Sequence, residues 1–205
     1  MAVSFMVIKA IIFDIDGVLA DSREAVARNT TELMAEFGFA VPRGAVERMS
    51  SAHSADSVLV ALAPSLGQDH ELLRRMLSRL SEKTARNIGL VKPTLLVSQI
   101  ALLAGKYKLA AASNRKASAK LVLRKLGLME HISAVVTSAD ARAKPEPDML
   151  LLAMKKLGVT AEEAVFVGDN PEDGLAAEGA GMKFVMLDGT DKKECEKLLA
   201  MLLGK

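Results

Sequence analysis

The feature that most constrains this sequence is an alternation of short apolar segments, which end in polar residues, with longer segments of helical periodicity. The first apolar segment, residues 7–13, ends in Asp14-Ile15-Asp16-Gly17. Four later segments have the same form: residues 108–112, 134–137, 164–167 and 183–187. Short apolar segments that stop abruptly are typical of buried strands. Their alternation with helices predicts an α/β fold with a doubly wound parallel sheet.

The segments between these strands have the spacing and the ends of helices. Apolar residues recur with helical periodicity in residues 117–126, 147–157 and 170–178, and a glycine follows each one: Gly127, Gly158 and Gly179. Glycine is common just past the end of a helix because it adopts the left-handed backbone conformation without strain. We therefore expect these helices to end at the glycines.

A second region, residues 22–89, breaks the alternation. It has helical periodicity in residues 25–37, 55–62 and 71–88, with proline or glycine at the joints and no convincing strand. This pattern predicts an α-helical cap domain, residues 21–89, inserted into a core domain that consists of residues 1–20 and 90–205.

The composition excludes several classes of protein. With 50% hydrophobic and 25% charged residues, the 205-residue chain is typical of globular proteins. Its longest apolar runs are six residues, far below the ~20 that cross a bilayer, so we expect no membrane association. The net charge of +2, the 3% aromatic residues and the absence of tryptophan argue against a nucleic-acid partner.

The cellular setting is predicted from the same composition. Cys195 is the only cysteine, so no disulfide can form within the chain, and the N-terminus lacks the basic start of a secretory signal. We therefore expect a cytoplasmic protein. One segment, residues 83–129, has ten Lys or Arg residues and no acid. It is either a solvated basic face or a field that attracts an anionic substrate.

Polar side chains follow several of the predicted strands, at the edge where parallel sheets bind ligands. Asp14 and Asp16 come after the first strand, Ser113 after another, and Asp169 and Asp173 after a third; Lys144-Pro145 lies in a further loop. Converging carboxylates repel one another unless a cation neutralises them. Oxygen ligands are those that Mg²⁺ prefers, so the sequence predicts a Mg²⁺ site here.

In these motifs the sequence resembles the haloacid dehalogenase superfamily, specifically its phosphatases with a helical cap, and most of all phosphoglycolate phosphatase and its close relatives. The motifs cover nearly the whole chain and occur in the expected order: Asp14-Ile15-Asp16-Gly17-Val18-Leu19-Ala20-Asp21-Ser22, Ser113-Asn114, Lys144-Pro145 and Gly168-Asp169-Asn170-Pro171-Glu172-Asp173. The resemblance implies a phosphomonoester hydrolase that works through an aspartyl phosphate.

The resemblance also implies a role for each motif residue. Asp14 would be the nucleophile and Asp16 the general acid and base. Ser113 and Lys144 would hold the phosphoryl oxygens. Mg²⁺ would be held by the Asp14 carboxylate, the Asp16 main-chain carbonyl and Asp169, with Asp173 ordering metal-bound water or Lys144.

The substrate is less constrained than the reaction. We expect a small phosphorylated metabolite, such as phosphoglycolate or a sugar phosphate, and a monomer or homodimer. Asn114, Asp21, Ser22 and Arg48 are the predicted substrate contacts. Further candidates for the leaving group are Arg43, Ser50, Ser51 and His53.

The sequence leaves two alternatives open. One is a phosphomutase or phosphotransferase, although such members of the superfamily usually have a histidine where this chain has Val26. The other is a non-catalytic binding module, which would be expected to lack the nucleophile or the acid, whereas Asp14 and Asp16 are both present.

Overall fold

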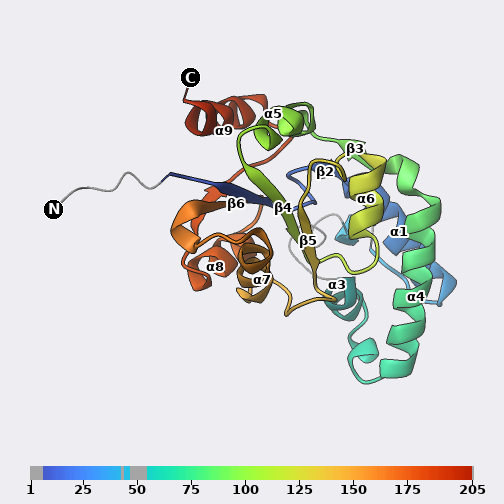
Figure 1. The fold of residues 1–205 in the computed structure, drawn as a ribbon. Coiled ribbons are helices and arrows are strands. Elements are labelled where there is room, and N and C mark those ends of the chain that lie inside the picture. Colours follow the sequence, from blue (N-terminus) through green and yellow to red (C-terminus); the bar gives the residue numbers. More distant parts are fainter. Residues whose placement is uncertain (1–6, 43, 47–54, 205) are drawn as a thin grey trace.

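A computed structural model describes residues 7–42, 44–46 and 55–204. Its centre is a five-stranded sheet in which every neighbouring pair of strands is parallel, in the order β5-β4-β1-β6-β7 (Figure 1). The strands are β1 (Ala10–Phe13), β4 (Lys108–Ser113), β5 (Ala134–Thr137), β6 (Ala164–Gly168) and β7 (Lys183–Met186). The predicted doubly wound α/β fold is confirmed.

Alternation of side chains along β1 builds one core on each face of this sheet. Ile11 and Phe13 pack into one hydrophobic cluster, and Ala10 and Ile12 pack into another. Parts of α5 (Ile100–Ala104), α6 (Ala119–Lys125) and α9 (Lys192–Leu203) belong to the first cluster, and parts of α7 (Asp148–Leu157) and α8 (Pro171–Gly179) to the second. All four residues of β1 are fully buried, which explains why this strand has no polar face.

A second helical unit follows β1, as the sequence predicts. Helices α1 (Arg23–Glu36), α3 (Ala55–Leu62) and α4 (His70–Arg86) enclose a hydrophobic cluster of their own, which includes Leu33, Leu59 and Met76. The chain enters and leaves this unit through two short antiparallel strands, β2 (Ala20–Asp21) and β3 (Lys92–Pro93). The inserted helical cap is confirmed, while its division from the core at residues 21 and 89 stays a prediction.

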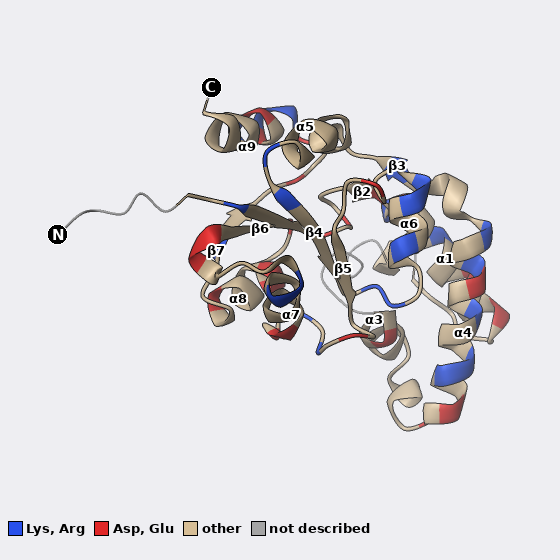
Figure 2. Ribbon diagram, viewed as in Figure 1, with Lys and Arg blue, Asp and Glu red and all other residues tan. Residues whose placement is uncertain are grey.

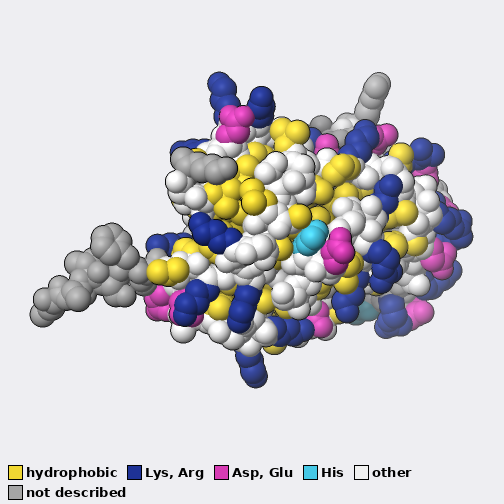
Figure 3. Space-filling view, turned by 45° about the horizontal axis from the view of Figure 1, so that its top comes forward, with side chains coloured by type: hydrophobic (Ala, Val, Ile, Leu, Met, Phe, Trp, Pro, Cys, Tyr) yellow, Lys and Arg dark blue, Asp and Glu magenta, His cyan; other side chains and the backbone are white. Residues whose placement is uncertain are grey.

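Short 3-10 helices complete the described elements: η1 (Pro64–Gly67), η2 (Ile88–Leu90), η3 (Leu95–Gln99) and η4 (Ala161–Glu163). Within the described ranges no helix is long and apolar enough to cross a membrane. Figure 3 shows one face of the molecule, on which hydrophobic side chains are interspersed with lysines, arginines and polar groups.

Helix α8 ends at Gly179, as predicted, but for a different reason. Gly179 is the last helical residue and lacks the left-handed conformation, which falls two residues later, at Gly181 (φ 67°). Gly127 and Gly158 do have positive φ, as their predicted role requires.

The order of strands in the sheet indicates where a ligand would bind. Strand order reverses at β1, whose neighbours β4 and β6 lie on opposite sides, and crevices form at such points beside the carboxyl ends of the strands.

Candidate active site

Asp14 lies directly after β1, at the crevice. Its backbone N–H donates a hydrogen bond to the Val167 carbonyl (2.8 Å), which holds the residue against β6. Its side chain is 6% exposed and accepts a hydrogen bond of 2.8 Å from Lys144 Nζ. Burial raises the pKa of Asp14 to about 8; Lys144 opposes this shift, and the nearby Asp173 and Asp16 add to it.

Lys144 is shared between two carboxylates. Besides Asp14, its Nζ lies 2.6 Å from Asp173 Oδ1, an ion pair between two side chains that are almost fully buried. Burial alone would lower the pKa of Lys144, but the charges of Asp14 and Asp173 outweigh it and raise the pKa above its usual value. The lysine therefore stays charged between the two acids.

Asn114 fixes the position of Lys144 through the main chain. Its Oδ1 accepts a hydrogen bond from the Lys144 backbone N–H (2.8 Å), and its Nδ2 donates to the Lys144 carbonyl (3.1 Å). The Ser138 hydroxyl donates to the Asn114 carbonyl (2.8 Å) and ties the same loop. The amide of Asn114, predicted as a substrate contact, is thus engaged with the loop that presents the lysine.

Asp169 and Asp173 are positioned by the turn from β6 into α8. Asn170 caps the helix by accepting from the Asp173 backbone N–H (3.2 Å), and Pro171 occupies the first turn. Asp173 Oδ2 in return accepts from the Asp169 backbone N–H (3.1 Å) and from Asn170 Nδ2 (2.9 Å). This reciprocal capping aims the other oxygen of Asp173 at Lys144.

Carboxylate oxygens of Asp14, Asp169 and Asp173 lie within 4.8 Å of one another. Burial raises the pKa of Asp169 to about 6, opposed by a hydrogen bond from Asn170 and reinforced by Asp173 and Asp16. Three closely spaced carboxylates are a suitable set of hard oxygen donors for a divalent cation such as Mg²⁺, which offsets their repulsion. The residues present therefore fit the metal that the sequence predicts.

Asp16 lies close to Asp14 but has different partners. Arg115 Nε donates to Asp16 Oδ2 (2.6 Å) and Arg115 Nη2 donates to Oδ1 (2.8 Å), while the Ser22 hydroxyl also donates to Oδ1. Burial would raise the pKa of Asp16, but the charge and hydrogen bonds of Arg115 outweigh it and hold the pKa below its usual range. Asp16 and Asp14 are thus shifted in opposite directions.

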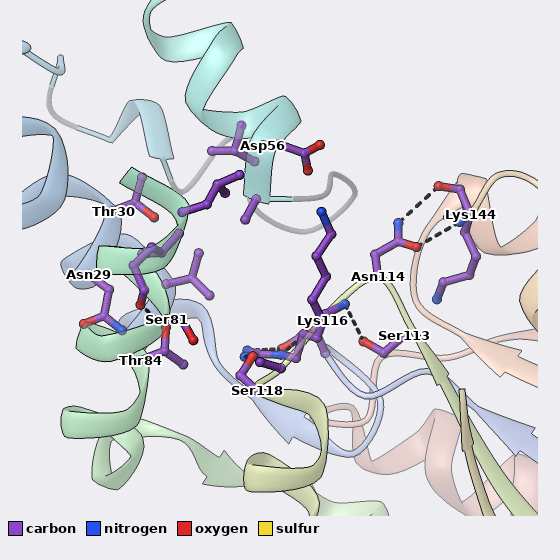
Figure 4. A pocket seen from close by; sticks show the side chains of 18 of the residues that line it. Asn29, Thr30, Asp56, Ser81, Thr84, Ser113, Asn114, Lys116, Ser118 and Lys144 are labelled. Carbon is purple, nitrogen blue, oxygen red and sulfur yellow. Dashed lines mark hydrogen bonds and ion pairs between the residues drawn. The ribbon is translucent and has the colours of Figure 1, made fainter. Parts of the chain in front are cut away.

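A cavity of about 450 Å³ opens above these groups, between the sheet and the helical cap. Figure 4 shows Ser113, Asn114 and Lys144 on one side and Asn29, Thr30, Ser81 and Thr84 of the cap helices on the other, with Lys116 extending between them. Val26, Val58, Leu77 and Leu80 add apolar surface on the cap side. Figure 2 shows Lys and Arg on α6, within the acid-free segment 83–129, and Arg115 and Lys116 of the same segment line the cavity.

The other predicted site residues differ in whether they line the large cavity. Ser113 is buried in the cavity wall, where its hydroxyl accepts from the Arg115 backbone N–H (3.3 Å). Asp21 forms a two-bond ion pair with Arg23 and lines a separate small hollow beside Asp169. Ser22 is engaged with Asp16. The predicted contacts Arg43, Arg48, Ser50, Ser51 and His53 lie outside the described residues.

The pairing of Arg115 with Asp16 is the main feature of the site that sequence reasoning missed. The only signal was the position of two basic residues, Arg115 and Lys116, directly after Ser113-Asn114. That position suggested a general field toward anions, not a contact with one of the acids.

Comparison with known proteins agrees with this geometry. The family model described as haloacid dehalogenase-like hydrolase matches residues 11–187. A phosphoglycolate phosphatase of Rhodospirillum rubrum is 31% identical over 191 residues, which cover 87% of this chain and 79% of the relative. One from Yersinia pestis is 27% identical over 186 residues, covering 87% and 80%.

A solved structure supports the same relation. The crystal structure of a subfamily IA hydrolase of the superfamily from Geobacter sulfurreducens has a TM-score of 0.72 and 27% identity, and the match covers 95% of this chain and 96% of that one. The chain belongs to the haloacid dehalogenase-like hydrolases. The predicted family is confirmed, and with it the prediction that the protein is an enzyme of the hydrolase class.

Proposed function

We propose that the protein is a Mg²⁺-dependent phosphomonoester hydrolase that works through an aspartyl phosphate on Asp14. The observation that carries the proposal is the surroundings of this carboxylate. It is buried at the end of β1, ion-paired to Lys144, and within 4.8 Å of the oxygens of Asp169 and Asp173. A nucleophile, a fixed cation and a metal site thus meet at one point.

The first half of the reaction replaces one bond to phosphorus by another. An Asp14 oxygen attacks the phosphorus in line, so that the Asp14–phosphorus bond forms while the bond from phosphorus to the leaving oxygen breaks. Asp16, in its protonated form, gives its proton to that oxygen, and the alcohol departs. Lys144, 2.8 Å from Asp14, balances negative charge on the transferring phosphoryl group.

The second half returns the enzyme to its starting state. Water attacks the phosphorus of the aspartyl phosphate, Asp16 takes up the proton of the water, and the Asp14–phosphorus bond breaks to release phosphate. The net reaction consumes one ester and one water. Splitting the displacement in this way lets Asp16 serve each half in turn.

Mg²⁺ fits the carboxylates of Asp14, Asp169 and Asp173, and when bound it supplies charge neutralisation between the nucleophile and the phosphate. The chain's own residues determine where this charge is held. Asp173 accepts hydrogen bonds from the turn before α8, and the backbone of Asp169 is tied into the same turn. The turn before α8 therefore holds Asp173 and the backbone of Asp169 in place, and the Asn170 side chain donates to both carboxylates.

The substrate that we propose is a small phosphorylated metabolite. Two relatives are phosphoglycolate phosphatases, and the cavity of about 450 Å³ has room for a leaving group of that size or for a sugar. Its mixed lining of hydroxyl, apolar and basic side chains suits a small polar molecule better than a nucleic acid. We further propose a cytoplasmic enzyme, acting as a monomer or homodimer.

The first experiment is phosphate release with and without Mg²⁺ from p-nitrophenyl phosphate, phosphoglycolate, sugar phosphates, nucleoside monophosphates and pyrophosphate. Metal-dependent release that is lost in Asp14→Asn is the expected result. Release that Asp14→Asn retains would contradict the nucleophile, and no release from any compound would contradict the hydrolase.

The same assay separates hydrolysis from transfer. A phosphoenzyme that persists in water and gives its phosphoryl group to an added sugar phosphate would favour the phosphotransferase alternative. Val26 lines the cavity at the position where the mutases of the superfamily usually have histidine, so we expect rapid hydrolysis instead.

A further inference from the structure

Two nitrogens of the Arg115 guanidinium group, Nε and Nη2, form a fork that binds the carboxylate of Asp16. The proposed reaction requires this carboxylate at the leaving group instead. Arg115 Nε and Nη2 bind both oxygens of Asp16 at 2.6 and 2.8 Å, and Arg115 Nη1 donates to the Ser118 hydroxyl at 3.1 Å. Two parallel bonds between guanidinium and carboxylate form a strong, geometrically specific contact. With both oxygens held in this way, Asp16 is not free to turn toward a leaving group.

Both members of the pair line the large cavity. Arg115 and Asp16 belong to its wall together with Asp14 and Lys144, and their side chains are 12% and 27% exposed. Ser118 holds the guanidinium from the side away from the fork. If Asp16 turned away, these two nitrogens of Arg115 would therefore face the cavity that Asp14 and Lys144 also line.

We propose that Arg115 is a positioning residue that holds Asp16 withdrawn in the resting enzyme and exchanges it for an anionic group, such as a carboxylate, on the leaving-group side of the substrate. A substrate carboxylate could occupy the fork as the Asp16 carboxylate does, because both groups have one negative charge and two acceptor oxygens. The exchange frees Asp16 to face the leaving oxygen. A substrate with a second anionic group therefore brings the enzyme's general acid into position.

This inference rests on the proposed function, and it narrows the substrate class. It favours phosphorylated hydroxy acids over alkyl phosphates of equal size that have no second anionic group. When a substrate has no second anion, nothing replaces Asp16 on Arg115. Freeing Asp16 for the reaction then breaks the ion pair with no compensating contact. Such a substrate therefore binds more weakly, and it also reacts more slowly because Asp16 does not face the leaving oxygen.

The decisive comparison uses two substrates of matched size, phosphoglycolate and 2-hydroxyethyl phosphate, which differ in a terminal carboxylate against a terminal hydroxyl. In the wild-type enzyme we expect kcat/KM to favour the acid. In Arg115→Met this preference should fall by on the order of 10- to 100-fold, the value of hydrogen bonds to a charged group. Arg115→Lys keeps the charge but not the fork, and should restore only part of the preference.

A control variant separates this effect from a general loss of positive charge. Lys120 lies on α6, is exposed and does not line the cavity, so Lys120→Met removes one charge from the same region. It should keep the wild-type preference. If it reduces the preference as much as Arg115→Met does, or if Arg115→Met lowers both substrates by the same factor, the exchange is refuted.

A second variant tests the exchange from the other partner, without requiring turnover. Asp16→Asn removes the internal anion that competes for the fork, so the inhibitor 3-phosphonopropionate should bind more tightly than to wild type, by about tenfold or more. The matched 3-hydroxypropylphosphonate should show little gain. Equal changes for the two inhibitors would refute the exchange.

The outcomes also separate this inference from the proposed function. A wild-type enzyme that releases no phosphate from any substrate contradicts the hydrolase. An enzyme that hydrolyses both matched substrates equally well contradicts the exchange alone. Folding of each variant is checked by its thermal unfolding.

Discussion

Gly17 makes room for a predicted metal ligand, and replacing it should damage the metal site more than the fold. The residue has φ 75°, and a Cβ at this position would lie 1.8 Å from Asp169 Oδ2, 2.3 Å from Cγ and 2.9 Å from Cβ. Rotation of the Asp169 side chain relieves the first two contacts but not the third. The turn cannot easily retreat, because the Gly17 carbonyl accepts from Gly189 and its N–H donates to Ala20.

Gly38 provides the matched control. It also has a positive φ of 80°, but a Cβ there would meet no atom within 4 Å. Both alanine variants should therefore lose about 1–2 kcal/mol for a left-handed non-glycine residue. For a chain of this size that corresponds to a fall in Tm of about 2–8 °C. Only Gly17→Ala carries the additional collision with Asp169.

The assay is thermal unfolding in EDTA and during Mg²⁺ titration, with Mg²⁺-dependent phosphate release alongside. Gly17→Ala should require at least about tenfold more Mg²⁺ for half-maximal stabilisation and activity, the loss typical of a disturbed metal site. Gly38→Ala should keep the wild-type requirement. The reasoning is refuted if the two variants lose equal stability and both retain the wild-type Mg²⁺ requirement.

Three further predictions address charge and packing. Since burial raises the pKa of Asp14 from 3.8 to about 8 and that of Asp169 to about 6, the folded state holds these protons more tightly than the unfolded state. Tm in EDTA should therefore fall as pH rises from about 4 to about 8, and saturating Mg²⁺ should reduce this slope; a flat profile in EDTA would contradict the shifts. Lys144→Met leaves two buried carboxylates without their shared cation, so denaturant unfolding in EDTA should show a loss of about 3–5 kcal/mol. Phosphate release should fall by about 10²–10³; full activity would exclude a role for this lysine. Tyr107→Phe removes the hydroxyl that donates to a main-chain carbonyl of α9, and should lower unfolding free energy by about 1 kcal/mol without changing turnover. A large fall in its turnover would mean that α9 influences the site.

The strands could be predicted because each is a short apolar run with a polar stop. The segment 134–137 and the helix 55–62 have the predicted bounds, and β1 begins three residues later than expected, at Ala10. In parallel sheets the carboxyl ends of strands share one edge, so the convergence of Asp14 and Asp169 follows from the strand order. The positions of these acids after strands therefore indicated that they would lie close together at one edge of the sheet.

Contacts made by long side chains across the site could not be predicted. Arg115 and Asp16 are 99 positions apart, and nothing local tells an arginine in a basic segment which of several acids it will bind. The sequence predicts Asn114 as a substrate contact, but its amide forms two hydrogen bonds with the Lys144 backbone. Helix α9 was not predicted either, although the Asp191 side chain caps its first turn.

The two aspartates after β1 are perturbed in the opposite sense to their proposed roles. A nucleophile must be ionised, yet burial raises the pKa of Asp14; a general acid must hold a proton, yet Arg115 lowers the pKa of Asp16. Burial raises the pKa of both acids, and they differ in their cation partners. Lys144 pairs with both Asp14 and Asp173, whereas two guanidinium nitrogens of Arg115 bind Asp16 alone.

Binding of metal and substrate would reverse both perturbations. A divalent cation among Asp14, Asp169 and Asp173 stabilises the ionised nucleophile, and a substrate anion on Arg115 removes the charge that keeps Asp16 ionised. Without these ligands, burial favours the protonated form of Asp14 and Arg115 favours the ionised form of Asp16, the opposite of their proposed roles. The metal acts on Asp14 and the second anion of the substrate acts on Asp16, which is why the matched substrate pair probes the acid while the Mg²⁺ titration probes the nucleophile.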